Sequence, residues 1–171
     1  DISCKPPSTK EDCKITEVLS RLSLAKTPLI VAGHGIRLSG MKHTFLDILK
    51  NLNIPVVTTF NGFDLLNEDT PQYIGRIGTI GQRAGNFALQ NADLVLFLGT
   101  RNNIRQISYN WENFARNAYK IVVDIDKAEL EKPLVKPDMA IHADLADFLP
   151  LLKESLTSID TVSYTHLRAH E

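Results

Sequence analysis

Short apolar runs along the chain each end in glycine, polar or acidic residues. They cover residues 28–33, 54–60, 93–99, 120–126 and 139–144. Within each run the apolar positions are consecutive rather than alternating, which is typical of strands that are buried on both faces. We therefore predict that these strands belong to a mostly parallel sheet with helices on both faces.

The segments between the runs carry apolar residues three or four positions apart, as on one face of a helix. This pattern predicts helices over residues 15–25, 41–53, 83–92, 111–118 and 146–156, and a single helical turn over 128–132 before Pro133. Right-handed crossovers between alternating strands and helices give a doubly wound α/β sheet of five or six strands. The predicted topology is Rossmann-like, as in DHS-like NAD/FAD-binding domains.

Three segments differ in character along the 171 residues. Residues 1–13 are polar and contain prolines, so we expect a linker there. Residues 14–157 form the predicted domain. Residues 158–171 look like a non-native tail, because the sequence from Val162 onward has no period and resembles translated adapter sequence. His166 and His170 have the i, i+4 spacing of metal ligands, but we set them aside with that tail.

Charge and cysteine usage exclude several classes of protein. The 19 basic and 20 acidic side chains give a formal charge of −1, which argues against a nucleic-acid partner. No run approaches the ~18 apolar residues of a membrane span, and no signal peptide is visible. Cys4 and Cys13 are too few for a zinc site, so we expect free thiols in a reducing, cytoplasmic compartment.

Candidate ligand-binding residues gather at the predicted carboxyl ends of the strands, where doubly wound sheets bind ligands. These ends are Gly33-His34-Gly35, Thr58-Thr59-Phe60-Asn61-Gly62, Gly99-Thr100-Arg101, Asp124-Ile125-Asp126 and Asp144-Leu145. Glycines allow a close backbone approach, arginines pair with phosphate, and acids accept hydrogen bonds from ribose or adenine. The mixture suits a nucleotide with an anionic middle.

The glycine pattern leaves two interpretations open. It is not the NAD fingerprint, because Gly40 comes two positions late and the next strand ends in Thr58 and Thr59 rather than an acid. The turn either approaches a nucleotide or only joins a strand to a helix. The glycine-rich run 75–85 either forms an anion nest at a helix N-terminus or is a loop on the rim of the sheet.

The charged candidates each have a functional and a structural interpretation. Arg101 and Arg105, four residues apart, form either a phosphate clamp or a solvated pair at a helix start. His34 has no acid, nucleophile or metal partner near it in sequence, so we expect a rim residue rather than a catalyst. Asp124 and Asp126 fit ligand contact or helix capping better than catalysis. We predict no catalytic residue and no metal ligand in this chain.

Five segments together resemble the central domain of thiamine-diphosphate-dependent enzymes, in the acetolactate synthase-like branch. They are "VAGHG", "IPVVTTFNG", "YIGRIGTIGQRAGNFALQNADLVLFLGTRNNIRQ", "FARNAYKIVVDIDKAEL" and "HADLADFL". The resemblance covers about residues 14–155. It implies a parent enzyme that uses thiamine diphosphate and Mg²⁺ to decarboxylate a 2-keto acid and transfer the acyl carbanion equivalent. The flanking pyrimidine- and diphosphate-binding domains, in a homodimer or homotetramer, hold these cofactors, so this chain alone is inactive.

The resemblance also implies a role for the middle domain. It binds FAD in acetolactate synthases and ADP in oxalyl-coenzyme A decarboxylase relatives, and in pyruvate decarboxylases it is an architectural scaffold with no nucleotide. The FAD contacts carried over to this sequence are Gly33, His34, Gly35, Thr59, Phe60, Arg76, Gly78, Gly99, Arg101, Asn103, Arg105, Asp124, Ile125, Asp144 and Leu145.

Three departures from the family pattern fall mostly at the flavin end of the expected site. His34 replaces a glycine, Asn103 replaces an aspartate, and Arg76-Ile77 replaces Met-His. A sirtuin-like NAD-dependent deacylase would share the sheet topology. It would need a catalytic histidine beside a zinc module, which two terminal cysteines do not supply.

Overall fold

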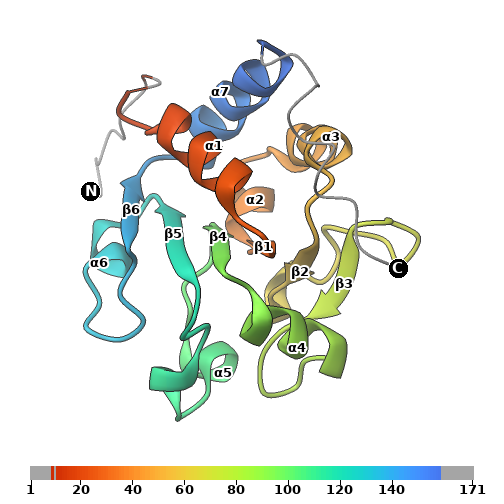
Figure 1. Ribbon diagram of the computed structural model, residues 1–171, viewed down its shortest axis with the longest axis vertical. Coiled ribbons are helices and arrows are strands. Elements are labelled where there is room, and N and C mark those ends of the chain that lie inside the picture. The colour runs from red at the N-terminus through yellow and green to blue at the C-terminus, as the bar shows by residue number, and fades with distance from the viewer. Residues whose placement is uncertain (1–8, 10, 159–171) are drawn as a thin grey trace.

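All the strands belong to one parallel sheet. The computed structural model describes residue 9 and residues 11–158 of the chain. The strands are β1 (Pro28–Ala32), β2 (Val56–Thr58), β3 (Tyr73–Arg76), β4 (Leu94–Leu98), β5 (Tyr119–Asp124) and β6 (Met139–His142). They lie in the order β3-β2-β1-β4-β5-β6, and every neighbouring pair is parallel (Figure 1). The predicted doubly wound α/β fold is therefore confirmed.

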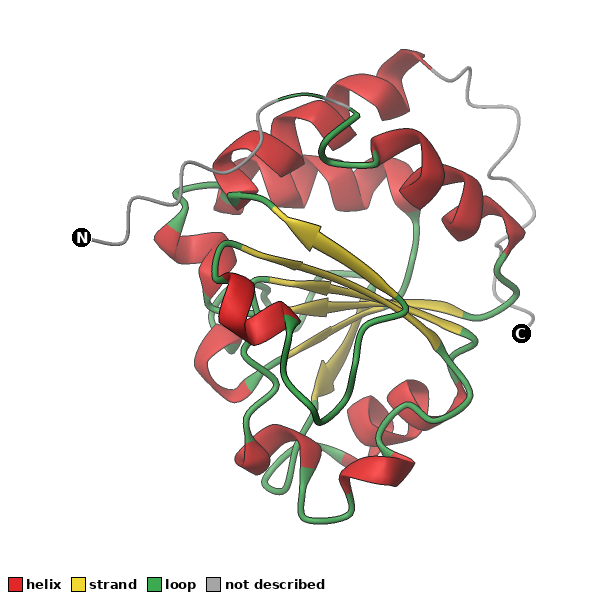
Figure 2. Ribbon diagram, turned by 90° about the vertical axis from the view of Figure 1, so that its left-hand side faces the viewer, coloured by secondary structure: helices red, strands yellow, loops and turns green. Residues whose placement is uncertain are grey.

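Helices cover both faces of the sheet (Figure 2). One face carries α1 (Ile15–Leu24), α2 (Gly35–Leu38), α3 (Lys42–Leu52) and α7 (Leu145–Ser158). The other face carries α4 (Arg83–Asn91), α5 (Ile104–Ile107) and α6 (Lys127–Leu130). Two 3-10 turns, η1 (Phe60–Gly62) and η2 (Trp111–Asn113), lie in the connections. Helical layers on both faces explain why β1 and β4, at the centre of the sheet, are apolar and buried at every position.

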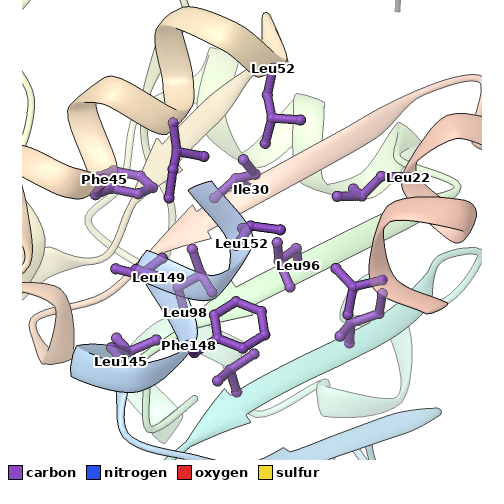
Figure 3. Close-up of a cluster of buried hydrophobic side chains, with 14 of the residues drawn as sticks. Leu22, Ile30, Phe45, Leu52, Leu96, Leu98, Leu145, Phe148, Leu149 and Leu152 are labelled. Carbon is purple, nitrogen blue, oxygen red and sulfur yellow. The ribbon is translucent and has the colours of Figure 1, made fainter. Parts of the chain in front are cut away.

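In the four inner strands β2, β1, β4 and β5, alternate residues enter two separate cores. In β4, Leu96 and Leu98 face the first core, whereas Val95 and Phe97 face the second. Side chains alternate between the two faces of a strand, so a consecutive apolar run fills both cores. Figure 3 shows Phe148 of α7 lying with Leu96 and Leu98 in the first core.

The structure corrects the predicted elements at three places. The predicted helix over 111–118 is only the 3-10 turn η2, because Ala115 has φ 46°, outside the helical region. Strand β3 was missed because Gly75 interrupts it with φ 137°. Its register against β2 also shifts between Val56 and Val57. Helix α2 was missed because its four residues lie inside the glycine-rich turn.

Cys13 is buried in the first core. Burial raises the pKa of the Cys13 thiol, and the charges of Asp147 and Asp12 raise it further. Cys4, His166 and His170 lie outside the described residues. Within residues 11–158, no helix has the length and apolar character needed to cross a membrane.

Candidate functional site

The strand order reverses direction between β1 and β4. In doubly wound sheets the crevice outside the carboxyl ends of two such strands is the usual ligand site. The turn Gly33-His34-Gly35 follows β1 at this point, and Gly99-Thr100-Arg101 follows β4. The sheet therefore brings together two of the predicted turns, which are about 65 positions apart in the sequence.

The glycines of these turns allow their backbones to touch. Gly33 donates its N–H to Leu98 at 2.9 Å, and Gly35 donates its N–H to Gly99 at 3.0 Å. A Cβ atom at Gly33 would lie 2.2 Å from the Gly99 carbonyl oxygen, and one at Gly35 would lie 2.7 Å from the Gly99 Cα. Glycine at these positions is thus explained by close backbone packing within the chain.

Three backbone donors remain at the same place. Within residues 11–158, no acceptor meets the N–H groups of His34, Thr100 and Arg101. Thr100 and Arg101 are successive in the chain, and successive backbone N–H groups can form anion-binding concavities in proteins. The Nδ1 atom of the His34 ring lies 3.1 Å from the Asn61 carbonyl oxygen after β2. The turns at the switch point therefore carry backbone donors that are free to bind an anionic group.

An acid from α6 holds the Arg101 side chain that follows β4. Its Nε and Nη2 each lie 3.1 Å from Oε1 of Glu129, whose side chain is only 8% exposed. Lys132 pairs with the same carboxylate and donates to the Arg101 carbonyl at 2.9 Å. The Arg101 side chain itself is 75% exposed, so a ligand can reach the guanidinium group from solvent.

The arginine pair does not lie on one helical turn. Arg101 precedes α5, whose N-cap Asn103 accepts a hydrogen bond from the Arg105 N–H at 3.1 Å. The Arg105 carbonyl accepts from both the N–H and the hydroxyl of Thr79, each at 3.0 Å. Arg101 and Arg105 therefore do not lie on one helix face, and the phosphate clamp stays a prediction.

Several amides of the glycine-rich loop already have partners within the chain, and the anion nest stays a prediction. The N–H of Gly78 donates to Asn86 Oδ1 at 2.9 Å, that of Gly81 to the Gly78 carbonyl, and that of Gln82 to the Arg76 carbonyl. A Cβ atom at Gly85 would lie 2.6 Å from the Arg76 carbonyl oxygen, so this glycine lets α4 pack closely on β3.

Acidic residues at the ends of β5 and β6 act partly as caps. Asp126 accepts a hydrogen bond from the Ala128 N–H and caps α6. Asp144 accepts from the Ala146 N–H at 2.8 Å at the start of α7. Asp124 is only 7% exposed, and its Oδ1 accepts the Asp126 N–H at 2.9 Å.

Asp124, at the carboxyl edge of the sheet, has a shifted pKa. Burial raises its pKa above the ordinary value, and the charges of Glu129 and Asp126 raise it further. Hydrogen bonds from the backbone oppose this shift. The carboxylate is therefore poorly solvated, and a hydrogen-bond donor on a ligand would stabilise it.

The other predicted site residues differ in accessibility. Phe60 is 50% and Ile125 49% exposed at their strand ends, whereas Thr59 and Leu145 are buried. The side chain of Leu145 packs against Gly99.

Sequence reasoning missed two amide side chains that fix the loops of this edge. Gln106 Nε2 donates at 3.0 Å to both Thr100 Oγ1 and Asn102 Oδ1. Asn86 bonds both polar atoms of the Gly78 peptide. Neither amide belongs to a recognisable motif, so no signal in the sequence marks it.

Within the described part of the chain, no group of three or more His, Cys, Asp or Glu side chains is arranged to hold a metal ion. The strand order defines a Rossmann-like α/β domain, and its switch point between β1 and β4 is the candidate ligand site.

Comparison with known proteins identifies the family. Residues 15–152 match the model of the thiamine pyrophosphate enzyme central domain, and the chain belongs to this family. It is 33% identical over 161 residues to a probable acetolactate synthase large subunit of Methanococcus aeolicus, covering 94% of this chain and 26% of that protein. It is 40% identical over 134 residues to the acetolactate synthase large subunit of Lactococcus lactis, covering 78% and 23%.

A third relative agrees with these two. The acetolactate synthase large subunit of Cyanidium caldarium is 34% identical over 158 residues, covering 90% of this chain and 26% of that protein. The family resemblance seen in the sequence is thus confirmed. The chain spans about a quarter of the length of the curated relatives it matches.

Proposed function

We propose that this chain is the central domain of an acetolactate synthase-like enzyme dependent on thiamine diphosphate and Mg²⁺. The parent enzyme decarboxylates a 2-keto acid and transfers the acyl carbanion equivalent to an acceptor, in the cytoplasm. Membership of the thiamine pyrophosphate enzyme central-domain family and three large-subunit relatives support this proposal.

The cofactors of that reaction belong to the rest of the parent. Its pyrimidine- and diphosphate-binding domains flank this one, in a homodimer or homotetramer. Thiamine diphosphate supplies the electron sink for decarboxylation there. The residues of this chain bind and orient, and the chain alone is inactive.

The domain itself holds a nucleotide, FAD, at the switch point. The observation that carries this proposal is the group of unpaired N–H donors on His34, Thr100 and Arg101, beside the exposed guanidinium of Arg101. A diphosphate at this place receives hydrogen bonds from backbone and arginine together. Gly33, Gly35 and Gly99 carry no side chain that would block this approach.

The two ends of the nucleotide lie on either side of the diphosphate. Asp124, Ile125, Asp144 and Leu145 follow β5 and β6 and contact ribose and adenine. The flavin end extends past Thr59, Phe60, Arg76, Gly78, Asn103 and Arg105. The poorly solvated carboxylate of Asp124 supports the first assignment, because a ribose hydroxyl gives it a donor.

ADP is the alternative ligand. One observation favours it: the Ile77 side chain, at a position where the family has a residue near the flavin, is 2% exposed and belongs to the second core. It cannot contact a flavin ring from there. The third hypothesis is a scaffold domain that binds no nucleotide. The direct packing of Gly35 on Gly99 supports it.

A titration of the purified chain with FAD and with ADP, followed by calorimetry, tests these readings. We expect saturable FAD binding that Arg101→Ala weakens about tenfold, because a charge-assisted hydrogen bond contributes about 1.5–3 kcal/mol. Arg116→Ala, which removes an arginine away from the crevice, should leave binding unchanged. Binding of ADP but not FAD would support the ADP hypothesis, and binding of neither would support the scaffold hypothesis.

A further inference from the structure

Two hollows lie on the face of the sheet that carries α4, α5 and α6, and Asn103 of the proposed flavin contacts lines one edge of the larger. The larger has a volume of about 440 Å³ and the smaller about 280 Å³. Trp111 and Pro133 line both hollows, so the two adjoin. We call this feature the tryptophan groove. One wall is formed by residues 102–116, and the other by residues 132–136.

Large apolar side chains are exposed in the tryptophan groove. Tyr109 is 86% exposed, Ile104 54%, Leu134 40% and Trp111 37%. Single exposed apolar residues are ordinary on a protein surface, but a contiguous group marks an interaction site. Tyrosine and tryptophan are also the residues that most often anchor protein interfaces.

Part of the groove lining is held in unfavourable backbone conformations. Six non-glycine residues of the described chain have positive φ, and three of them line the groove: Asn102 (43°), Ser108 (66°) and Val135 (52°). Such conformations cost on the order of 1–3 kcal/mol each, and they concentrate where a chain is shaped for a ligand or partner. The β-branched Val135 is the least expected of the three.

The charge of the lining is mainly positive. Arg116, Lys120, Lys132 and Lys136 line the two hollows together with one acid, Glu112. Lys120 pairs with Asp138, and Lys132 with Glu129. Neither Arg116 nor Lys136 forms an ion pair with any described residue. A second copy of the same face would bring like charges together, which is unfavourable, so the charge pattern favours an acidic partner.

We propose that the tryptophan groove is the docking site for an acidic segment of the parent polypeptide outside these 171 residues. The segment inserts apolar side chains beside Trp111 and Tyr109 and directs carboxylates to Arg116 and Lys136. The proposal rests on the proposed function, in which this chain is one domain of a larger enzyme. About three quarters of the length of each matched relative lies outside the region that this chain spans, which supplies the candidate segment.

Hydrogen–deuterium exchange of the intact parent polypeptide and of the 171-residue chain tests this proposal. We expect amides in residues 107–111 and 132–136 to exchange about tenfold more slowly in the parent, because docking suppresses local opening. The double variant Arg116→Glu, Lys136→Glu should remove that protection, because the new carboxylates repel those of the segment. The variant breaks no ion pair among the described residues, so the fold itself is not disturbed. Lys26→Glu, an exposed lysine outside the groove, is the matched control and should leave the protection intact.

Each other outcome overturns the proposal. Equal exchange in both proteins means that no parent segment covers the groove. Protection that appears in the 171-residue chain as its concentration rises means that a second copy is the occupant. Protection that survives the double charge reversal excludes an acidic segment. Assay of thiamine-diphosphate-dependent activity in the same parent samples tests the proposed function separately, because an active parent with an unprotected groove rejects only the docking site.

Discussion

Gly35 donates its N–H to the carbonyl oxygen of Gly99 across 3.0 Å, so that the turns after β1 and β4 are joined directly through their backbones. No side chain lies between the two turns at this point. The contact lies at the switch point, so the candidate site depends directly on the packing of the sheet.

The first prediction concerns this packing. Gly33→Ala should destabilise the fold by about 2–3 kcal/mol, because its Cβ would lie 2.2 Å from the backbone oxygen of Gly99, which cannot move alone. Gly40→Ala is the comparison, since Gly40 has φ 74° but no atom within 4 Å of its added Cβ. Its cost should be only about 1 kcal/mol. Urea unfolding followed by the fluorescence of Trp111 measures both, and equal costs would refute the steric explanation.

A second prediction concerns the core beneath α4 and α5. Phe97 is fully buried, and its ring centroid lies 6.0 Å from that of Phe114. Phe97→Ala should lower the free energy of unfolding by about 3–5 kcal/mol, through lost apolar burial and a residual cavity. Phe87→Ala deletes the same group from α4, where it is 69% exposed, and should change stability by less than about 0.5 kcal/mol. Thermal unfolding measures both variants. Equal melting temperatures would contradict the burial of Phe97 in the second core.

Most of the fold could be predicted because most of its strands are recognisable in the sequence as continuous apolar runs. Strand β3 could not, because its four residues include Gly75 at φ 137° and the exposed Ile74 on an outer strand. Such a strand is defined by its pairing with β2 rather than by its own pattern.

The candidate site was predictable to a smaller extent. Glycines and acids at strand ends can be read from the sequence, since strand ends meet at one edge of a parallel sheet. The contact between Gly35 and Gly99 depends on which strands are neighbours, and the sequence alone does not give that order. The bonds of Asn86 and Gln106 to loop groups follow no spacing rule. The assignment of nucleotide contacts and the domain limits at residues 13 and 157 stay predictions.

A third prediction concerns the contact between α3 and α7. Asp47 accepts hydrogen bonds from Lys153 at 2.8 Å and from Lys50 at 3.1 Å, and these cations lower the pKa of its carboxyl. A lowered pKa stabilises the fold above the unfolded value of about 3.9, and this contribution is lost as the pH falls through the folded value. Asp47→Asn should therefore lower the urea midpoint at pH 7 but not at about pH 2. Asp69→Asn, at an exposed aspartate without an ion pair among the described residues, should have no effect at either pH.

The last prediction concerns Asp124, whose effect on stability depends on pH in the opposite direction to that of Asp47. Burial raises the pKa of this carboxyl, so the folded state binds its proton more tightly than the unfolded state does. The resulting stability is fully present below about pH 3.9 and is lost as the pH rises through the folded value. Asp124→Asn stays neutral at every pH and can still accept the Asp126 N–H through its amide oxygen.

Asp124→Asn should therefore raise the urea midpoint at pH 7, with a difference that disappears near pH 3. The same substitution should weaken nucleotide binding, because it removes the carboxylate assigned to the ribose. Unfolding curves at the two pH values and a parallel FAD and ADP titration measure both effects on one protein. A variant that is less stable at pH 7 would show that the carboxylate stabilises the fold. Unchanged affinity in a protein that does bind nucleotide would remove Asp124 from the site.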